Sequence, residues 1–274
     1  MEIVAPYLLI PFGALLILGI PVAFALGLAC VIFLFFSGTT IPPLILVTEM
    51  YTAVNQFALL ALPMFVLTGE LLNRCDITEK LVEVARLMVG WLKGGLAHVN
   101  ILTSMFFAGI SGSVLADAAS LGPILIPAMI RERYPPAFSA AVTAASAVIG
   151  AIIPPSTVAI IIGGQLQISI GGLFAGGIIP GVLIGLALMV TAGVISARRG
   201  YGDIHPFEGI IPMAKGSAKA APALLIPFII LGGILGGIFT PTEAGAIAVL
   251  YTLIIGTFYY RTLDMRKLID SMIG

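Results

Sequence analysis

Long apolar stretches dominate this chain, and only short polar segments separate them. Several approach or exceed the roughly 20 residues that an α-helix needs to cross a bilayer. The candidate spans are Ala5–Leu18, Val22–Phe36, Ala58–Leu72, Ala137–Gln165, Leu173–Ala197, Ala221–Leu235 and Pro241–Tyr260. Charged residues make up only 9% of the chain, whereas soluble domains carry roughly 25%. We therefore predict an all-α polytopic membrane protein, with the lipid bilayer as its main solvent.

The first 36 residues allow two arrangements. Val22–Phe36 is short for a straight crossing, so residues 5–36 could form either two spans or one long tilted helix. Pro21 either breaks the helix between them or only kinks it. The segment Met1–Ile10 lacks the basic region and the small-residue cleavage site of a secretory signal, which indicates the start of a span.

The positive charges predict the topology. All 13 Lys and Arg residues fall within residues 74–93, 131–133, 198–219 and 261–267. With the proposed spans, all four stretches lie on one side of the membrane, while segments 37–56 and 167–172 on the other side have none. The positive-inside rule makes the charged side cytoplasmic. If residues 5–36 are two spans, the N-terminus lies outside.

An interfacial helix is predicted at residues 78–92. Its apolar residues share one helical face, and its charged residues lie on the other face. The apolar set is Leu81, Val84, Ala85, Met88 and Leu92, and the charged set is Glu79, Lys80, Glu83 and Arg86. Trp91 suits the headgroup level. We expect this segment to lie in the membrane plane.

Residues 95–130 predict a re-entrant helical hairpin, because both ends meet the positively charged side and glycine and serine interrupt the middle. Its tip contains Ser111, Gly112 and Ser113, with Asp117 shortly after. Polar backbone at membrane depth persists only where protein or a water-filled site surrounds it. A charge at the bilayer centre costs about 2.5–3.5 kcal/mol. We expect the tip to bind an ion or a substrate, and Asp117 either to take part or to cap the returning helix.

A second break is predicted within residues 137–165, making this a discontinuous helix. Pro154 and Pro155 lack the amide hydrogen that a helix needs and free the carbonyls of the preceding turn. A broken helix next to a re-entrant hairpin is typical of a midplane ion and substrate site. The candidate ligands of this segment are Ser146, Gly150, Pro154, Pro155 and Ser156.

The domain organisation is predicted to be an inverted repeat. Pro-containing turns at Pro21 and Pro241 each join two apolar runs and face opposite sides in the proposed topology. Residues 1–200 would form the first repeat, 201–220 a cytoplasmic loop, and 221–274 the start of a second, truncated repeat.

Other function classes lack their characteristic patterns. The formal net charge is zero, which gives no case for nucleic-acid binding. No His-Glu-x-x-His pattern, paired intramembrane carboxylates or ATP-binding Gly-x-x-x-x-Gly-Lys loop is present, so we predict that the protein is not an enzyme and has no cofactor. Cys30 and Cys75 lack metal or redox spacing. Glu243, three residues after Thr240, fits a helix capping box rather than a buried acid.

These motifs together resemble the large membrane subunit of the tripartite ATP-independent periplasmic (TRAP) transporters, over essentially the whole chain. The matching segments are Gly19–Gly27, Gly109–Ser113, Ala116–Ala118, Ala145–Gly150, Ile153–Ser156 and Phe239–Gly245.

The resemblance implies a sodium-coupled, elevator-type carrier in a bacterial inner membrane. It further implies a small membrane subunit and a periplasmic binding protein as partners, and an organic acid anion as substrate. The hairpin tip and the proline break would then build half of the ion site, with a possible Na⁺ half-site at Ser111, Ser113, Gly150 and Ser156.

Family members are much longer than 274 residues, so the chain is expected to be incomplete at its C-terminus. Two alternatives stay open: a related ion-coupled carrier that works without a binding protein, and a structural membrane subunit that does not transport.

Overall fold

The computed structural model describes residues 5–203, 205–207 and 209–273, and these form helices with no strand. The described chain divides into two compact units, Met1–Gln56 and Phe57–Gly274. The two units are separated by how closely their residues pack, so this division does not test the predicted inverted repeat. The predicted all-α class is confirmed for the residues described.

From residue 5 onward, the N-terminal unit contains three α-helices, and a π-helical segment Ala5–Leu9 leads into the first of them. These helices are α1 (Ile10–Ile17), α2 (Val22–Phe36) and α3 (Leu44–Val54). Gly19, with φ of 78°, and Pro21 separate α1 from α2, and the two helices pack against each other. Residues 5–36 are therefore two helices, and the alternative of one long tilted helix is wrong.

The larger unit begins with a 3₁₀ turn at Phe57–Leu60 and continues with helices close to the predicted bounds. They are α4 (Ala61–Arg74), α5 (Ile77–Val89), α6 (Gly95–Ser111), α7 (Val114–Arg131), α8 (Pro136–Ala147), a 3₁₀ turn Val148–Ala151, α9 (Thr157–Leu166), α10 (Ile170–Arg199), α11 (Ile210–Leu235), α12 (Pro241–Ile254), a π-helical segment Ile255–Tyr259 and α13 (Met265–Ile273).

Five stretches of the described chain are long and apolar enough to cross a bilayer. They are Phe57–Arg74, Val114–Arg131, Ile170–Arg199, Ile210–Leu235 and Pro241–Tyr259. Many large apolar side chains on these helices are exposed, such as Leu183, Phe228 and Leu250. A soluble protein rarely exposes so much apolar surface. The chain is therefore a multi-pass membrane protein.

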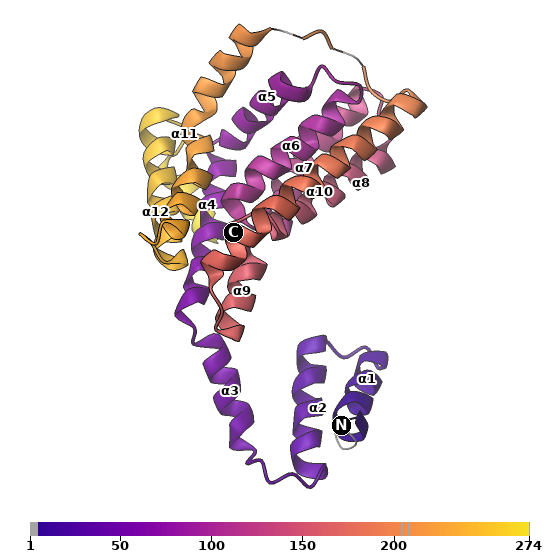
Figure 1. The fold of residues 1–274 in the computed structure, drawn as a ribbon, viewed down its shortest axis with the longest axis vertical. Coiled ribbons are helices and arrows are strands. Elements are labelled where there is room, and N and C mark those ends of the chain that lie inside the picture. The colour runs from indigo at the N-terminus through magenta and orange to yellow at the C-terminus, as the bar shows by residue number, and fades with distance from the viewer. Residues whose placement is uncertain (1–4, 204, 208, 274) are drawn as a thin grey trace. The chain divides into compact units, whose positions relative to one another are not determined.

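Within the larger unit, α6 occupies the centre. It packs against α7, α8 and α10, and these four helices run alongside one another in Figure 1. On the other side of the unit, α4 packs along α12, and α5 packs on α11. Most of α6 is buried, including Phe107 and Ile110. The first arm of the α6–α7 hairpin, α6, thus lies between two groups of helices.

The structure differs from the prediction in the segment expected to be a loop. Helix α11 begins at Ile210 and includes Lys215 and Lys219, so residues 210–220 are helical rather than loop. Hydropathy did not predict a helix at residues 210–220, because the two lysines make this segment less apolar. Lysine is nevertheless a good helix former. A helix that continues beyond the apolar core extends its charged end toward water.

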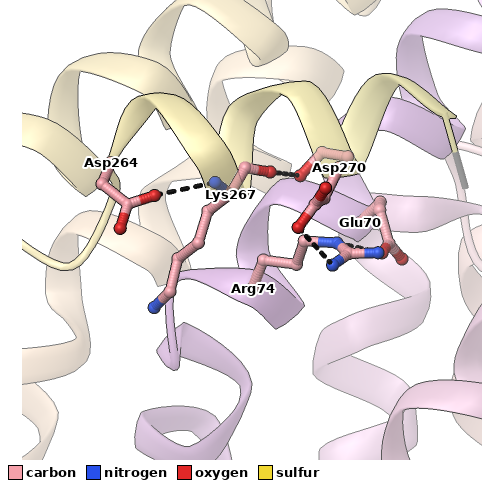
Figure 2. Close-up of polar contacts among 6 residues, drawn as sticks. Glu70, Arg74, Asp264, Lys267 and Asp270 are labelled. Atoms are coloured by element: carbon pink, nitrogen blue, oxygen red, sulfur yellow. Dashed lines mark hydrogen bonds and ion pairs between the residues drawn. The ribbon is translucent and has the colours of Figure 1, made fainter.

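The C-terminal helix α13 is attached to the end of α4 by charged side chains, as Figure 2 shows. Arg74 Nε binds Glu70 Oε1 at 2.7 Å, and Arg74 also lies 3.8 Å from Asp270 on α13. Lys267 Nζ lies 3.5 Å from Asp76. The Asp264 carboxylate caps α13 by accepting the Lys267 amide hydrogen at 2.7 Å. We call this group of side chains the α4–α13 corner.

Candidate functional site

The hairpin tip consists of two residues between α6 and α7. Gly112 ends α6 in the left-handed conformation, with φ of 62°, and its amide donates to the Ala108 carbonyl at 3.2 Å. Glycine adopts this conformation without a steric penalty, which explains why the helix stops here. Ser113 then begins α7, since its hydroxyl accepts the Ala116 amide hydrogen at 3.3 Å. The tip is therefore a tight helix–turn–helix connection.

The proline break has a closely similar construction. After α8 and its 3₁₀ turn, the backbone runs through Pro154 and Pro155 to Ser156, which caps α9 by accepting the Ala159 amide hydrogen at 3.1 Å. The backbone angles of the two capping residues, Ser113 and Ser156, agree within 4° in φ and 1° in ψ (−126°, 122° and −122°, 121°). Two helices, α7 and α9, therefore begin in the same way.

The tip and the break are in direct contact. The Gly112 carbonyl accepts two hydrogen bonds from Thr157, one from the backbone amide and one from the hydroxyl, each 3.0 Å long. A Cβ atom at Gly112 would overlap the Pro155 carbonyl. A Cβ at Gly150 would lie 3.3 Å from the Ser113 carbonyl carbon. The expected approach of the two breaks is therefore present, and it depends on glycine at the tip.

Helix α4 closes a third side of the tip. A Cβ atom built at Gly69 would lie 2.9 Å from the Ser111 Cβ, so α4 passes within van der Waals distance of the turn. Ser111 is completely buried as a result. Its hydroxyl oxygen lies 3.4 Å from the Ser113 amide.

Two carbonyl oxygens at these breaks already have hydrogen-bond partners. The Ala151 carbonyl, released by Pro155, accepts the Ser156 hydroxyl hydrogen at 2.5 Å. The Gly112 carbonyl is occupied by Thr157. Carbonyl oxygens have two lone pairs, so a bonded oxygen can still accept from or coordinate a second group. The junction is thus more internally bonded than the sequence alone predicted.

Asp117 lies in the first turn of α7 and is completely buried. Its backbone amide donates to the Ser113 carbonyl at 3.0 Å. Neither carboxylate oxygen has a hydrogen-bond partner within the described part of the chain. The partial positive charge of the α7 N-terminus offsets some of the cost of a negative charge at this position. Asp117 is thus next to the tip but makes no contact that joins it to the break.

Ser146, a predicted candidate ligand, takes part in the contact between α8 and α6. It is completely buried in α8 and bonds to α6: its oxygen accepts from the Ser104 hydroxyl at 3.0 Å, and its hydroxyl lies 3.2 Å from Asn100 Oδ1. Sequence reasoning missed Asn100, Ser104 and Thr157. Polar residues one turn apart in an apolar helix, as Asn100 and Ser104 are, were the available signal.

Glu243 is confirmed as a capping residue. Its carboxylate accepts the Thr240 amide hydrogen at 2.8 Å, while the Thr240 hydroxyl accepts the Glu243 amide hydrogen at 3.3 Å. This reciprocal pair satisfies two amide groups at the start of α12, so Glu243 belongs to the helix end and not to the site.

Comparison with known proteins identifies the family. The profile of the "Tripartite ATP-independent periplasmic transporter, DctM component" matches residues 9–274. The sialic acid TRAP transporter large permease protein SiaM of Vibrio cholerae is 42% identical, with 94% of this chain and 60% of that protein covered. The isethionate TRAP transporter permease protein DctMQ of Oleidesulfovibrio alaskensis is 40% identical, with 96% and 41% covered.

A third relative, the C4-dicarboxylate TRAP transporter large permease protein DctM of Vibrio cholerae, is 36% identical over 94% of this chain and 56% of that protein. The chain thus spans between 41% and 60% of the length of these relatives. All three relatives are named as permeases, which confirms the prediction that the protein is not an enzyme. The chain belongs to the DctM component family of the TRAP transporters, as its sequence motifs predicted.

Proposed function

We propose that this chain supplies one half of the ion and substrate site of a sodium-coupled secondary transporter for organic anions. The observation that carries this proposal is the junction between the hairpin tip and the proline break, where Thr157 donates twice to the Gly112 carbonyl. Two interrupted helices that meet inside an apolar protein are typical of a midplane transport site.

The Na⁺ half-site would use neutral oxygens. Ser111, Ser113, Gly150 and Ser156 lie at or beside the junction, with Ser113 next to Gly150 and Ser156 next to Gly112. Hydroxyl and carbonyl oxygens are hard ligands suited to an alkali cation. An ionised carboxylate at Asp117, in the first turn of α7, would favour a cation nearby.

The substrate would be an anion because two helix N-termini begin at this junction. Helices α7 and α9 start at Val114 and Thr157, and the N-terminal end of a helix attracts negative charge. The named substrates of the relatives are sialic acid, isethionate and C4-dicarboxylates, all of which carry an acidic group. We extend that class, an organic anion, to this chain.

The working assembly would include a small membrane subunit and a periplasmic binding protein, in the inner membrane of a bacterium. Because the tip and the break interlock, we propose that they move together as one body, which is the motion of an elevator-type carrier. A carrier without a binding protein remains the alternative. Co-purification of the complete transporter with a small membrane protein separates the two.

The coupling ion is tested by uptake into proteoliposomes that contain the complete transporter. Uptake of a labelled organic anion should require an inward sodium gradient and should fall at least about tenfold when potassium replaces sodium. An inward proton gradient of equal size is the control. Uptake that follows the proton gradient and ignores sodium would refute sodium coupling while leaving the family assignment intact.

The re-entrant hairpin is tested by labelling single cysteines with an impermeant thiol reagent in intact cells. If the positively charged segments are cytoplasmic, cysteines introduced at Glu83 in α5 and at Lys215 in α11 should stay unlabelled until the membrane is permeabilised. A cysteine in segment 37–56 should be labelled at once. Rapid labelling at Glu83 or Lys215 in intact cells would mean that the hairpin does not enter from the cytoplasm.

A further inference from the structure

A buried polar network joins the first arm of the hairpin to the first half of the broken helix. Asn100 Nδ2 donates to the Thr143 hydroxyl oxygen at 2.7 Å. The Ser146 hydroxyl lies 3.2 Å from Asn100 Oδ1, and Ser104 donates to Ser146 at 3.0 Å. The exposed fraction of these four side chains is between 0% and 4%. We call this group the α6–α8 network.

The network lies on the two helices that lead to the junction between the tip and the break. Asn100 and Ser104 lie one turn apart on α6, which leads to Gly112, while Thr143 and Ser146 lie on α8, which leads to Gly150. The two ends of these helices are the partners in the tip–break contact. A slip of α6 along α8 would therefore move Gly112 relative to Pro155. Hydrogen bonds with fixed partners oppose such a slip, whereas apolar packing alone permits several registers.

Asn100 makes two of the three hydrogen bonds that join α6 to α8 in this network. It bonds to both α8 hydroxyls, using its amide nitrogen for Thr143 and its carbonyl oxygen for Ser146. Removing it would break both of these bonds, while the two hydroxyls would keep only their bonds to the Ser139 and Thr143 carbonyls of α8 and the bond from Ser104 to Ser146. Ser104 extends the network toward Asp117: its hydroxyl faces that carboxylate but donates its single hydrogen to Ser146.

We propose that Asn100 is a positioning residue for the ion site: it sets the register of α6 against α8 and thereby the distance between the tip and the proline break. This inference rests on the proposed sodium-coupled function. Asn100 does not itself contact the ion in this proposal. Its loss should weaken sodium binding, because the ligands of a binding site must be held within about 0.5 Å of their productive positions.

The experiment measures the sodium concentration for half-maximal uptake in the complete transporter, reconstituted in proteoliposomes. Asn100→Ala should raise this concentration at least about tenfold, with a smaller change in the maximal rate at saturating sodium. Thr103→Val is the matched control. Thr103 is on the same helix and completely buried, and its hydroxyl has no hydrogen-bond partner in the described structure, so this variant should stay within about twofold.

A second variant covers the case in which Asn100→Ala does not insert. Thr143→Val keeps the shape of the side chain and removes the acceptor for Asn100, and it should raise the half-maximal sodium concentration about three- to tenfold. The double variant Asn100→Ala with Thr143→Val should show less than the product of the two single effects, because both remove the same hydrogen bond.

The outcomes separate this inference from the proposed function. If wild-type uptake does not depend on sodium, the proposed function fails. If wild-type uptake is sodium-dependent but Asn100→Ala and Thr143→Val lower only thermal stability, leaving the half-maximal sodium concentration unchanged, Asn100 has a structural role only and the inference is wrong. An equal shift in Thr103→Val would also overturn it, since that variant removes no hydrogen bond.

Discussion

The α6–α8 network and the α4–α13 corner both join distant helices through polar side chains, yet their environments are opposite. In the network the side chains are neutral and at most 4% exposed. In the corner they are charged, and the side-chain exposure is 34% and 50% for the Arg74–Asp270 pair and 36% and 56% for Lys267–Asp76. Water competes for every contact in the corner and for none in the network.

From this difference we can predict which of the two regions has the larger influence on the geometry of the site. Exposed ion pairs contribute about 0–1 kcal/mol because solvent and salt screen them. A buried hydrogen bond contributes a similar net amount when intact, but breaking it strands a polar group at a cost of about 1–3 kcal/mol. Figure 2 shows the charged contacts of the corner, but we expect the buried neutral contacts of the network to control the site.

The largest effect is expected from Gly112→Ala at the buried junction. The added Cβ would overlap the Pro155 carbonyl, and the left-handed φ of 62° is unfavourable for alanine. Uptake by the complete transporter should fall about a hundredfold or more, while the protein still inserts. Gly176→Ala is the control, because a Cβ at Gly176 has no atom within 4 Å. Equal activity of the two variants would mean that close approach at the tip is unnecessary.

A moderate effect is expected from Ser156→Ala, which removes a helix cap together with the hydrogen bond to the Ala151 carbonyl. Loss of the cap and of the hydrogen bond to a partly buried carbonyl should cost about 1–3 kcal/mol. The unfolding temperature in detergent should fall by roughly 2–4 °C for each kcal/mol. Ser169→Ala, which removes the corresponding cap of α10 at a more exposed position, should shift it less. A larger fall in unfolding temperature for Ser169→Ala than for Ser156→Ala would contradict the idea that burial makes the cap at Ser156 more important.

The smallest effect is expected from Arg74→Ala in the corner. Its partners Glu70 and Asp270 have side chains 30% and 50% exposed, so water replaces the lost contacts, and the change in stability should stay below about 1 kcal/mol. Uptake should remain within about twofold of the wild type. Thermal unfolding at low and high salt measures the pair directly. A larger loss of stability for Arg74→Ala than for Ser156→Ala would mean that the exposed corner matters more than the buried contacts.

The two breaks show how local chemistry made parts of the site predictable. Gly112 and the Pro154–Pro155 pair interrupt their helices where expected. A left-handed glycine and a missing amide hydrogen each disrupt the helical turn in which they lie, so their effect is local. The helix bounds around them, Gly95–Ser111 and Val114–Arg131, agree closely with the predicted hairpin 95–130. The same local logic identified Glu243 as a cap.

The partners across these breaks were not predictable in the same way. Thr157 occupies the Gly112 carbonyl from 45 residues away, and Ser146 reaches Asn100 from 46 residues away. Ser146 was predicted as a candidate ligand from its place in the discontinuous helix, and only the packing of α8 on α6 showed that its hydroxyl bonds to Ser104 and Asn100.

The residues alone were enough to predict that this chain is a helical membrane protein, where its helices break, and which family it resembles. Hydropathy, backbone chemistry and short motifs each act over one or two helical turns, so they can be read directly from the residues. The packing of the helices was needed to show which oxygens at the breaks already have hydrogen-bond partners and that Asn100 links the two interrupted segments. Hydrogen bonds between helices depend on the register and rotation of both partners, and no local pattern sets these.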